Sequence, residues 1–376
     1  MKKVFSAGNV ALALCLLITC AWTAWGVIEM FHEGWYAPFE WLFFLLPAGV
    51  CLALTLFALA WPRLGGYLLI AIGIGSYAWL LGMTALRFGP SLTAALRNLP
   101  VSGLLALIGV LFLREARQRK RTARPREPRW WRRNLPSLLA VGVPLLLGVS
   151  LALEPAHRVA NRVDDGDYGA RRIRGNGVDL TWASAGPGWQ RGVTWNQIAL
   201  YGLPPVGLEG KSSGRGECRG SVSAGCATAD DMARYNICLF LSRDGSRLEE
   251  TVQGFWRMPT TEEIVRSLVR HGENARCTWN GRTGKQPCGV TPDKETPLWN
   301  PRSPIIYLWS AEEADAGHAY YVTYNGAVYV AAKSVGMDSR GYRCVREAED
   351  RGQRVGEQTP EIAHEAIPKA GNRRER

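Results

Sequence analysis

Long apolar runs fill the first 153 residues and do not recur in the rest of the chain. A helix needs about 17–25 such residues to cross the hydrocarbon core of a bilayer. The sequence therefore predicts a multi-span α-helical membrane region followed by a water-soluble domain. Residues 1–134 are expected to hold four spans, and residues 135–153 a fifth. The first four are expected at about 10–27, 41–61, 65–86 and 99–113.

A strongly basic segment separates the fourth and fifth spans. Residues 114–133 contain ten Lys and Arg residues against two Glu. Because Lys and Arg are retained on the cytoplasmic side, this segment and the N-terminal pair Lys2 and Lys3 are expected in the cytoplasm. Five spans then place the C-terminal domain in a periplasm or outside the cell. We expect a multi-pass protein of the bacterial inner (cell) membrane; a cleaved signal peptide is the alternative for the first span.

The net charge of +12 belongs mostly to the membrane half. Residues 1–153 hold 15 basic and 5 acidic residues, against 30 and 28 in the remainder. The excess is interpreted as a topology signal that favours membrane lipid, and not nucleic acid, as a partner. No span core contains a charged residue or His, which argues against ion-coupled transport. In the third span, Gly73, Gly75 and Ser76 favour close packing of helices, with a dimer motif or a permeation path as alternatives.

Cysteine usage supports the same placement. Three cysteines lie in the predicted spans, and the C-terminal part holds six. An even number there is typical of disulfides in an oxidising compartment. The alternative is zinc, but the C-x2-C and H-x3-H spacings are absent, so we predict no metal and no cofactor. The six are Cys218, Cys226, Cys238, Cys277, Cys288 and Cys344.

The C-terminal part reads as an α+β domain between two polar segments. Residues 154–177 are expected to form a stalk, and residues 347–376 a disordered tail. One helix is expected from Asp230 or Asp231 to about residue 242, and a second begins at Thr260 or Thr261. Asn325-Gly326 predicts a hairpin turn with positive φ at both positions. Strands are expected over 177–183, 305–309, 319–323, 327–331 and 341–346.

Residues 256–263 (WRMPTTEE) carry a family resemblance. They resemble the signature of the Lcl C-terminal, or DUF1566, domains, which are related to C-type-lectin-like and formylglycine-generating-enzyme folds. Residues 307–310, 319–334 and 342–346 resemble later motifs of that family in the same order. The resemblance covers only the C-terminal half, 178–346, and implies a C-type-lectin-like fold. Its structural signature comprises Trp256, Arg257, Pro259, Thr260, Glu263, Trp309 and Arg343.

The resemblance also implies a disulfide framework. In related folds a cysteine of the first helix pairs with one on the last strand, which corresponds here to Cys238 and Cys344. Two further pairs, Cys277–Cys288 and Cys218–Cys226, are expected from their proximity in the chain.

No catalytic residue is predicted. His157, His271, His318 and His364 lack a neighbouring nucleophile motif. The E-P-N, Q-P-D and W-N-D motifs of calcium-dependent lectins are absent, and the paired-cysteine site of formylglycine-generating enzymes does not map onto this chain.

A binding role is therefore the preferred interpretation. The long loop at about 273–304 is expected to recognise a protein or a cell-envelope glycan. The protein would display a lectin-like domain without enzymatic activity; a periplasmic enzyme and a membrane sensor remain as alternatives. The candidate ligand-binding residues are Trp279, Trp299, Asn300, Tyr320 and Tyr324.

Overall fold

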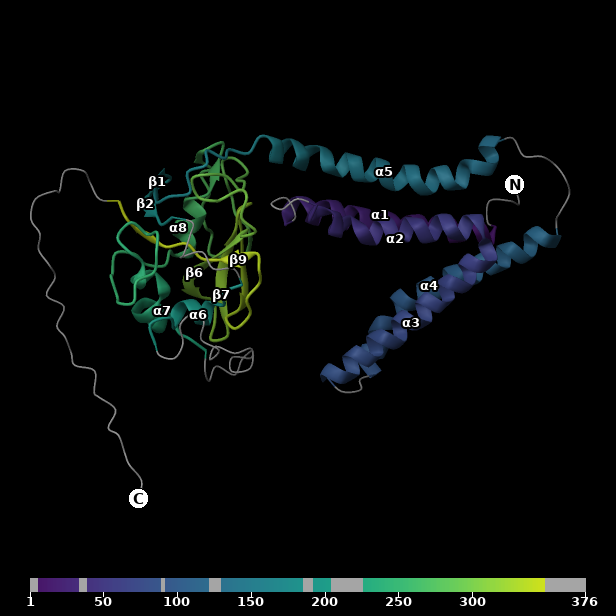
Figure 1. Ribbon diagram of the computed structural model, residues 1–376, viewed down its shortest axis with the longest axis horizontal. Helices are drawn as coiled ribbons and strands as arrows, with labels where there is room; N and C mark the ends of the chain where they lie inside the picture. Colours follow the sequence, from purple (N-terminus) through teal and green to yellow (C-terminus); the bar gives the residue numbers. More distant parts are fainter. Residues whose placement is uncertain are drawn as a thin grey trace, which may run out of the picture.

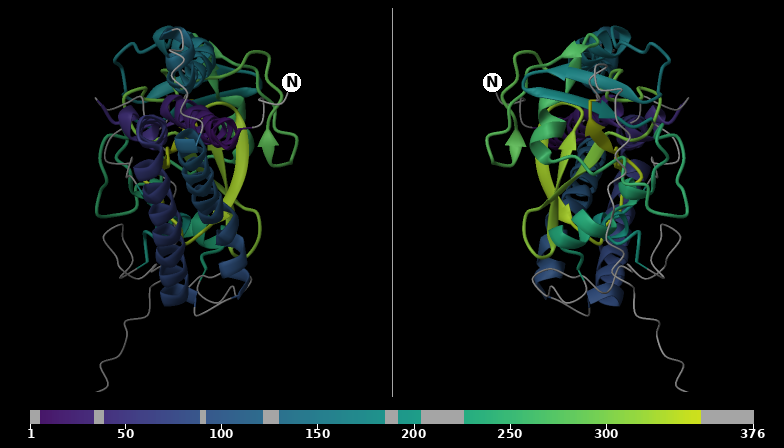
Figure 2. Two further views of the ribbon diagram at one scale, coloured as in Figure 1. Left: turned by 90° about the vertical axis from the view of Figure 1, so that its right-hand side faces the viewer. Right: turned by 90° about the vertical axis from the view of Figure 1, so that its left-hand side faces the viewer.

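The chain consists of a long helical part followed by a domain of short strands and helices (Figure 1). Along the long axis, the domain lies behind the helices in one view and in front of them in the opposite view, so it lies over one end of the bundle (Figure 2). The structure is a computed structural model. It describes residues 6–33, 39–88, 92–121, 130–184, 192–203 and 226–348.

The helical part has the composition of a multi-pass membrane protein. Among the described residues, α1, α2, α3 and α5 are long and apolar enough to cross a membrane. The 30-residue α4 contains the predicted fourth span, 99–113, but is not one of these four, so the fifth crossing stays a prediction. The long helices are α1 (Ala7–His32), α2 (Trp41–Ala60), α3 (Pro62–Phe88), α4 (Leu92–Arg121) and α5 (Trp130–Ala160).

Small residues allow α3 and α4 to pack backbone against backbone. A Cβ atom on Gly109 would lie 2.5 Å from the carbonyl oxygen of Gly66, and one on Gly73 would lie 2.7 Å from that of Ser102. Ser76 Oγ also donates a hydrogen bond to Ser102 Oγ (3.2 Å). Gly73 and Ser76 therefore support packing within the bundle, the first of the roles considered for them.

The two ends of the bundle make different contacts. At one end, the backbone N–H of Gly8 on α1 donates to Glu115 Oε2 on α4 (3.1 Å). The start of the basic segment therefore lies beside the start of α1. The other end of α1 meets the C-terminal domain (Figure 1). Between α1, α2 and α5 lies an apolar cavity of about 430 Å³.

Two main sheets build the C-terminal domain. A three-stranded sheet has the order β1-β2-β10, and a five-stranded sheet has the order β5-β8-β7-β6-β9, in which only β6 and β9 are parallel. The strands are β1 (Arg171–Gly175), β2 (Val178–Trp182), the pair β3 (Val269–Arg270) and β4 (Glu273–Asn274), β5 (Gly284–Lys285), β6 (Tyr307–Glu313), β7 (His318–Thr323), β8 (Ala327–Ala332), β9 (Arg340–Gly341) and β10 (Val345–Glu347). The short helices are α6 (Trp195–Ala199), α7 (Ala229–Tyr235), a 3₁₀ turn (Ile237–Phe240) and α8 (Thr261–Arg266).

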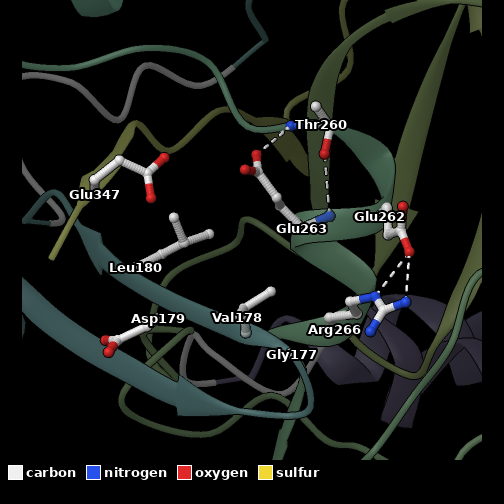
Figure 3. A pocket seen from close by; sticks show the side chains of 9 residues that line it. All are labelled: Gly177, Val178, Asp179, Leu180, Thr260, Glu262, Glu263, Arg266 and Glu347. Carbon is white, nitrogen blue, oxygen red and sulfur yellow. Dashed lines mark hydrogen bonds and ion pairs between the residues drawn. The ribbon is translucent and has the colours of Figure 1, made fainter.

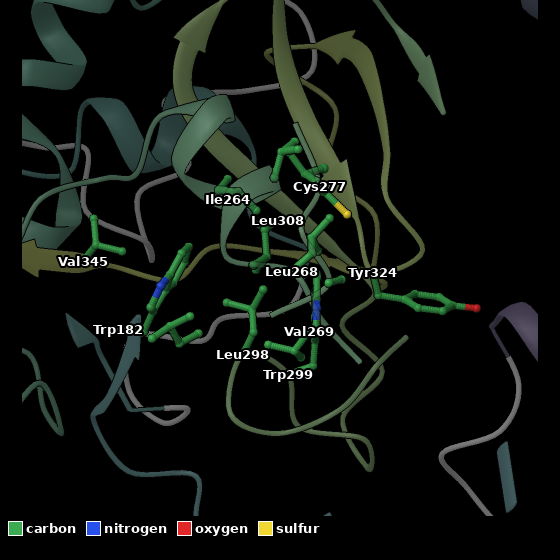
Figure 4. Packing of buried hydrophobic residues seen from close by; sticks show 14 of the residues in the cluster. Trp182, Ile264, Leu268, Val269, Cys277, Leu298, Trp299, Leu308, Tyr324 and Val345 are labelled. Atoms are coloured by element: carbon green, nitrogen blue, oxygen red, sulfur yellow. The ribbon is translucent and has the colours of Figure 1, made fainter. Parts of the chain in front are cut away.

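Buried side chains form two clusters in this domain. The first packs Trp182, Trp299 and residues of α8 against Leu308 and Val345 (Figure 4). The second contains four fully or almost fully buried aromatic residues and the Cys238–Cys344 disulfide. The aromatic residues of the second cluster are Trp195, Trp256, Trp309 and Tyr342.

The predicted α8 begins with a complete capping box. Thr260 Oγ1 accepts the backbone N–H of Glu263 (3.2 Å), and Glu263 Oε2 accepts the backbone N–H of Thr260 (2.8 Å). These reciprocal bonds satisfy two backbone donors that a helix start leaves without intrahelical partners. The helix ends at Arg266, and Val269 belongs to β3.

Three predicted elements differ in detail from the structure. The helix expected from Asp230 or Asp231 to 242 begins at Ala229 and stops at Tyr235, because Asn236 is extended and its side chain accepts the backbone N–H of Cys238. The strand expected over 341–346 is divided between β9 and β10, which belong to different sheets. In the Asn325-Gly326 turn only Gly326 has positive φ (86°), because its N–H closes a turn onto Thr323 instead.

The segment expected to be a stalk is structured and lies against the domain. Helix α5 continues through Ala160, and residues 171–175 form β1, which pairs along its whole length with β2. The backbone N–H of Asp165 donates to Thr296 Oγ1 (3.3 Å). The domain is therefore not separated from α5 by an extended stalk. Of the expected tail, only Glu347 and Ala348 lie within the described residues.

Candidate functional site

The predicted ligand-binding residues are mostly packing residues. Trp299 is 1% exposed and Tyr324 2% exposed, and both belong to the first core cluster. Trp279 and Tyr320 pack against that cluster and meet edge to face, with ring centroids 5.7 Å apart. The side chain of Asn300 accepts the backbone N–H of Arg302 (2.8 Å) within a turn. These five side chains therefore do not form one exposed face.

The loop at 273–304 folds back onto the rest of the protein. The Cys277–Cys288 disulfide closes its first part. Residues 293–296 are buried, which is unusual for a segment with the sequence Asp-Lys-Glu-Thr. The reason is a contact with the end of α5.

Arginines tie the end of α5 to this loop. Arg162 donates to Asp293 Oδ1 (2.9 Å), and Arg158 Nε lies 3.6 Å from Asp293 Oδ2. Within the domain, Arg270 binds Asp293 (3.1 Å) and Glu295 (2.9 Å). Both carboxylates are 0% exposed. Since buried carboxylates need cationic partners, this loop depends on the charge of Arg158 in α5 and of Arg162 just after it.

The end of α1 contacts two tyrosines of the same domain. His32 Nε2 lies 2.9 Å from Tyr307 Oη, and His32 Nδ1 lies 3.2 Å from Tyr324 Oη. Tyr307 Oη also donates to Glu33 Oε1 (3.1 Å). The ring of Tyr324 points away from its cluster toward α1 (Figure 4), and the guanidinium of Arg162 lies 5.7 Å from its centre.

These contacts join α1, α5 and the domain in one buried polar network, which we call the junction. Burial raises the pKa of Tyr324 to about 12, and burial together with the charge of Glu33 raises the pKa of Tyr307. Both tyrosines are therefore neutral hydrogen-bonding groups at physiological pH. The junction comprises His32, Glu33, Arg158, Arg162, Arg270, Asp293, Glu295, Tyr307 and Tyr324.

A lysine beside the junction is also buried. Burial, and then the charge of Arg162, lowers the pKa of Lys294 to about 7. Its amine donates to the carbonyl oxygen of Ser303.

A polar cleft of about 460 Å³ lies between β2 and α8 (Figure 3). Part of the family-like signature lines it, because Thr260, Glu262 and Glu263 face this space from the start of α8. Asp179 and Glu347 face it from the other side (Figure 3). The remaining lining residues are Gly177, Val178, Leu180 and Arg266.

Arginines hold the acidic side chains of this cleft in place. Arg257 makes a two-pronged contact with Glu263 (2.8 and 2.7 Å) and binds Glu347 (2.6 Å). Arg266 binds Glu262 (2.6 Å). Burial raises the pKa of Glu263, but the bonds from Arg257 and from the backbone N–H of Thr260 outweigh it, so the pKa is lowered. The cleft thus presents three carboxylates, each paired with an arginine.

The other signature residues are internal supports. The indole N–H of Trp256 donates to the carbonyl of Ser242 (2.9 Å), and that of Trp309 donates to Val193 (3.0 Å). The carbonyl of Pro259 accepts the backbone N–H of Ala311 (2.7 Å). The remaining member, Arg343, is 2% exposed and donates to the carbonyl oxygens of Ala183, Pro297 and Leu298.

Disulfides connect distant parts of the domain. The structure contains the Cys238–Cys344 pair, with Cα atoms 5.6 Å apart, as well as Cys277–Cys288. Cys226 is disulfide-bonded, whereas Cys218, its expected partner, lies outside the described residues.

Catalytic or metal-binding arrangements are not evident in the described part of the chain. No group of three or more His, Cys, Asp or Glu side chains there is placed to hold a metal ion. His318 Nδ1 lies 2.9 Å from Asp315 Oδ1, but this pair is at the surface, with the two side chains 39% and 62% exposed.

Two buried polar features have no distinguishing pattern in the sequence. The acidic residues of the junction look in sequence like a solvated charge run in a loop, and His32 looks like an ordinary polar helix end. The buried Lys333, which binds Glu313 (2.5 Å) and lies 4.7 Å from the ring of Trp195, also lacks a distinguishing local pattern.

The comparisons add no relative: no protein-family model, no curated protein and no solved structure matches this chain.

Proposed function

We propose that this is a membrane-anchored binding protein that presents its C-terminal domain outside the cytoplasm, without enzymatic activity. The junction is the observation on which the proposal rests. Two helices of membrane-spanning composition end at the domain and share a buried network of charges and hydrogen bonds with it. The junction would hold a recognition domain in a fixed orientation at the membrane.

Two features support the location. The domain contains disulfides, which persist in oxidising compartments and are rare in the cytosol. The basic segment 114–133, which the positive-inside rule assigns to the cytoplasm, begins at the end of the bundle away from the domain. A bacterial inner membrane with a periplasmic or extracellular domain fits both features.

The Lcl C-terminal, or DUF1566, resemblance is part of the proposal. Its signature residues have coherent structural roles, since Thr260 and Glu263 cap α8 and Trp256 and Trp309 are buried. The Cys238–Cys344 bridge follows the pattern that this resemblance implies. A C-type-lectin-like fold is the architecture that we infer from it.

The polar cleft is the ligand site that the geometry favours. Ionised carboxylates and guanidiniums form strong, directional hydrogen bonds with hydroxyl and amide groups. The cleft offers both, held in place by Arg257 and Arg266. A cell-envelope glycan or a polar peptide of a partner protein fits this chemistry better than an apolar ligand does.

A binding experiment tests this site. The full-length protein in lipid nanodiscs would be titrated with soluble cell-wall glycan fragments and followed by calorimetry. Glu262→Ala and Arg266→Ala should each weaken binding by about tenfold, the effect of losing one hydrogen bond to a charged group. The matched control is the exposed α7 pair Asp230 and Arg234, whose alanine variants should bind normally. Equal affinity in all variants would refute the cleft as the site.

The junction also favours a second candidate, a membrane sensor. If ligand binding moves the domain relative to α1 and α5, the contact between α1 and Tyr307 should change. Disulfide cross-linking of a cysteine pair across this contact, with and without glycan fragments, distinguishes the two functions. A ligand-dependent yield supports a sensor, and an unchanged yield supports simple display.

A further inference from the structure

A row of tyrosines extends from the junction across the five-stranded sheet. Tyr307 of β6 meets Tyr321 of β7, with ring centroids 5.4 Å apart, and Tyr321 meets Tyr329 of β8 at 5.9 Å. The register pairs Tyr321 with Tyr329, so these two side chains lie on the same face of the sheet. The row begins beside His32, at the end of α1.

Three apolar side chains near this row are exposed. Tyr329 is 44% exposed, Val335 44% and Met337 43%. Arg340 connects them, because its guanidinium lies 4.5 Å from the ring of Tyr321 and donates to Val335 O (3.1 Å) and Met337 Sδ (3.4 Å). We call this group the patch: the exposed Tyr329, Val335 and Met337, the half-buried Tyr321, and the buried Arg340 that links them.

Strands that carry residues of the patch lie on the side of the domain that is turned toward the spans. Figure 1 shows β7 and β9 on that side, whereas α7 lies on the opposite side. Loop 333–339, which carries Val335 and Met337, leads directly into β9. Because His32 is the last residue of a helix with membrane-spanning composition, the tyrosine row starts at the level where such a helix leaves the bilayer.

We propose that the patch rests on the headgroup layer of the bilayer. Tyrosine rings favour this layer because they combine an apolar body with a polar hydroxyl group. Exposed Val and Met side chains gain by leaving water, and a contiguous apolar patch on a soluble surface marks a contact. The junction holds the patch beside the membrane, so contact with lipid requires no further ordering of the domain. The one exposed acid of this loop, Asp338, can remain in water at the edge of the contact.

Lipid-based quenching tests the proposal on the full-length protein. In a parent without the three span cysteines, Met337→Cys or Val335→Cys would be labelled with a small fluorophore and reconstituted into phosphatidylcholine–phosphatidylglycerol vesicles. Nitroxide-labelled lipids, with the nitroxide near the headgroup, should quench both labels several-fold more strongly than a label on Arg234→Cys of α7. Aqueous iodide should show the reverse order. The unmodified parent supplies the background signal.

A charge variant keeps the test independent of the labelled side chain. Tyr329→Glu should lower the lipid quenching of the label at position 335, because a buried carboxylate disfavours the contact, whereas Arg234→Glu should leave it unchanged. The proposal is overturned if patch labels are quenched by lipid no more than the α7 label. Protection of the patch labels from both quenchers would also overturn it, since a protein surface would then cover the patch.

Discussion

Asp293→Asn should destabilise the C-terminal domain far more than an ordinary surface substitution. The side chain of Asp293 is 0% exposed and receives Arg162 at 2.9 Å, Arg270 at 3.1 Å and Arg158 at 3.6 Å. Asparagine keeps the shape but removes the charge. Arg158 of α5, Arg162 just after it and Arg270 then lose the carboxylate with which they pair, where water has little access.

The magnitude follows from burial. Removing one partner of a buried ion pair costs about 3–5 kcal/mol. We expect the lower end, about 3 kcal/mol, because Arg270 keeps Glu295 at 2.9 Å and Arg158 is 22% exposed. With a urea m-value of about 2 kcal/mol/M, this corresponds to a midpoint lowered by about 1.5 M.

Pulse proteolysis in urea measures this on the full-length protein in detergent. The intact domain fragment is quantified on a gel at each urea concentration, which follows the domain transition separately from the helices. The control Asp230→Asn breaks an exposed pair on α7, with side chains 64% and 68% exposed, and should change stability by less than about 0.5 kcal/mol.

A double-mutant cycle assigns the effect to the boundary between α5 and the domain. Arg162→Met, Asp293→Asn and the double variant should show a coupling energy of about 1 kcal/mol or more. The proposed role of the junction is refuted if Asp293→Asn lowers the free energy of unfolding no more than Asp230→Asn does. It is also refuted if the effects of Arg162→Met and Asp293→Asn are additive. Either result would mean that the ion pairs of Asp293 do not fix the domain to the end of α5.

Three further outcomes are expected. Replacing Cys238 and Cys344 by Ala opens a 106-residue loop and should cost about 5 kcal/mol, against about 3 kcal/mol for the shorter disulfide, as measured by urea unfolding. Gly109→Ala should lower the thermal stability of the bundle, because its Cβ would lie 2.5 Å from a backbone oxygen of α3, whereas Gly103→Ala meets open space; equal melting temperatures contradict this packing. Because the pKa of Glu263 is lowered below 4.5 on folding, its stabilising effect is complete above that pH and is lost on acidification. Glu263→Gln should therefore reduce the fall in the free energy of unfolding below pH 4.5. An unchanged dependence on pH would count against the pairing of Glu263 with Arg257.

The sequence was most informative where a local rule decides the structure. Thr260 and Thr261 marked the start of α8, and Asn325-Gly326 marked the turn between β7 and β8. Small residues in α3 have a direct packing meaning in a membrane helix. These patterns depend on neighbours within a few residues, so they are readable without tertiary information.

Contacts between distant elements could not be predicted in the same way. The sequence around Asp293 has the polarity of a solvated loop, and its burial depends on Arg162, which follows α5, and on Arg270 of β3. Residues 171–175 looked like part of a polar stalk because three of the five are arginines and only Ile173 is buried. Of the aromatic residues predicted to bind a ligand, Trp299 and Tyr324 are buried in the core, and Trp279 and Tyr320 pack against it.

The proposed topology places the C-terminal domain outside the cytoplasm and the basic segment 114–133 inside it. Labelling of single cysteines with a membrane-impermeant maleimide tests this topology most directly. In spheroplasts of a strain whose protein lacks the span cysteines, Val252→Cys, at a position 60% exposed on the domain, should react at once. Thr122→Cys, within the basic segment, should react only after the membrane is permeabilised. Labelling of Thr122→Cys in intact spheroplasts, with Val252→Cys protected until lysis, would contradict an exported domain.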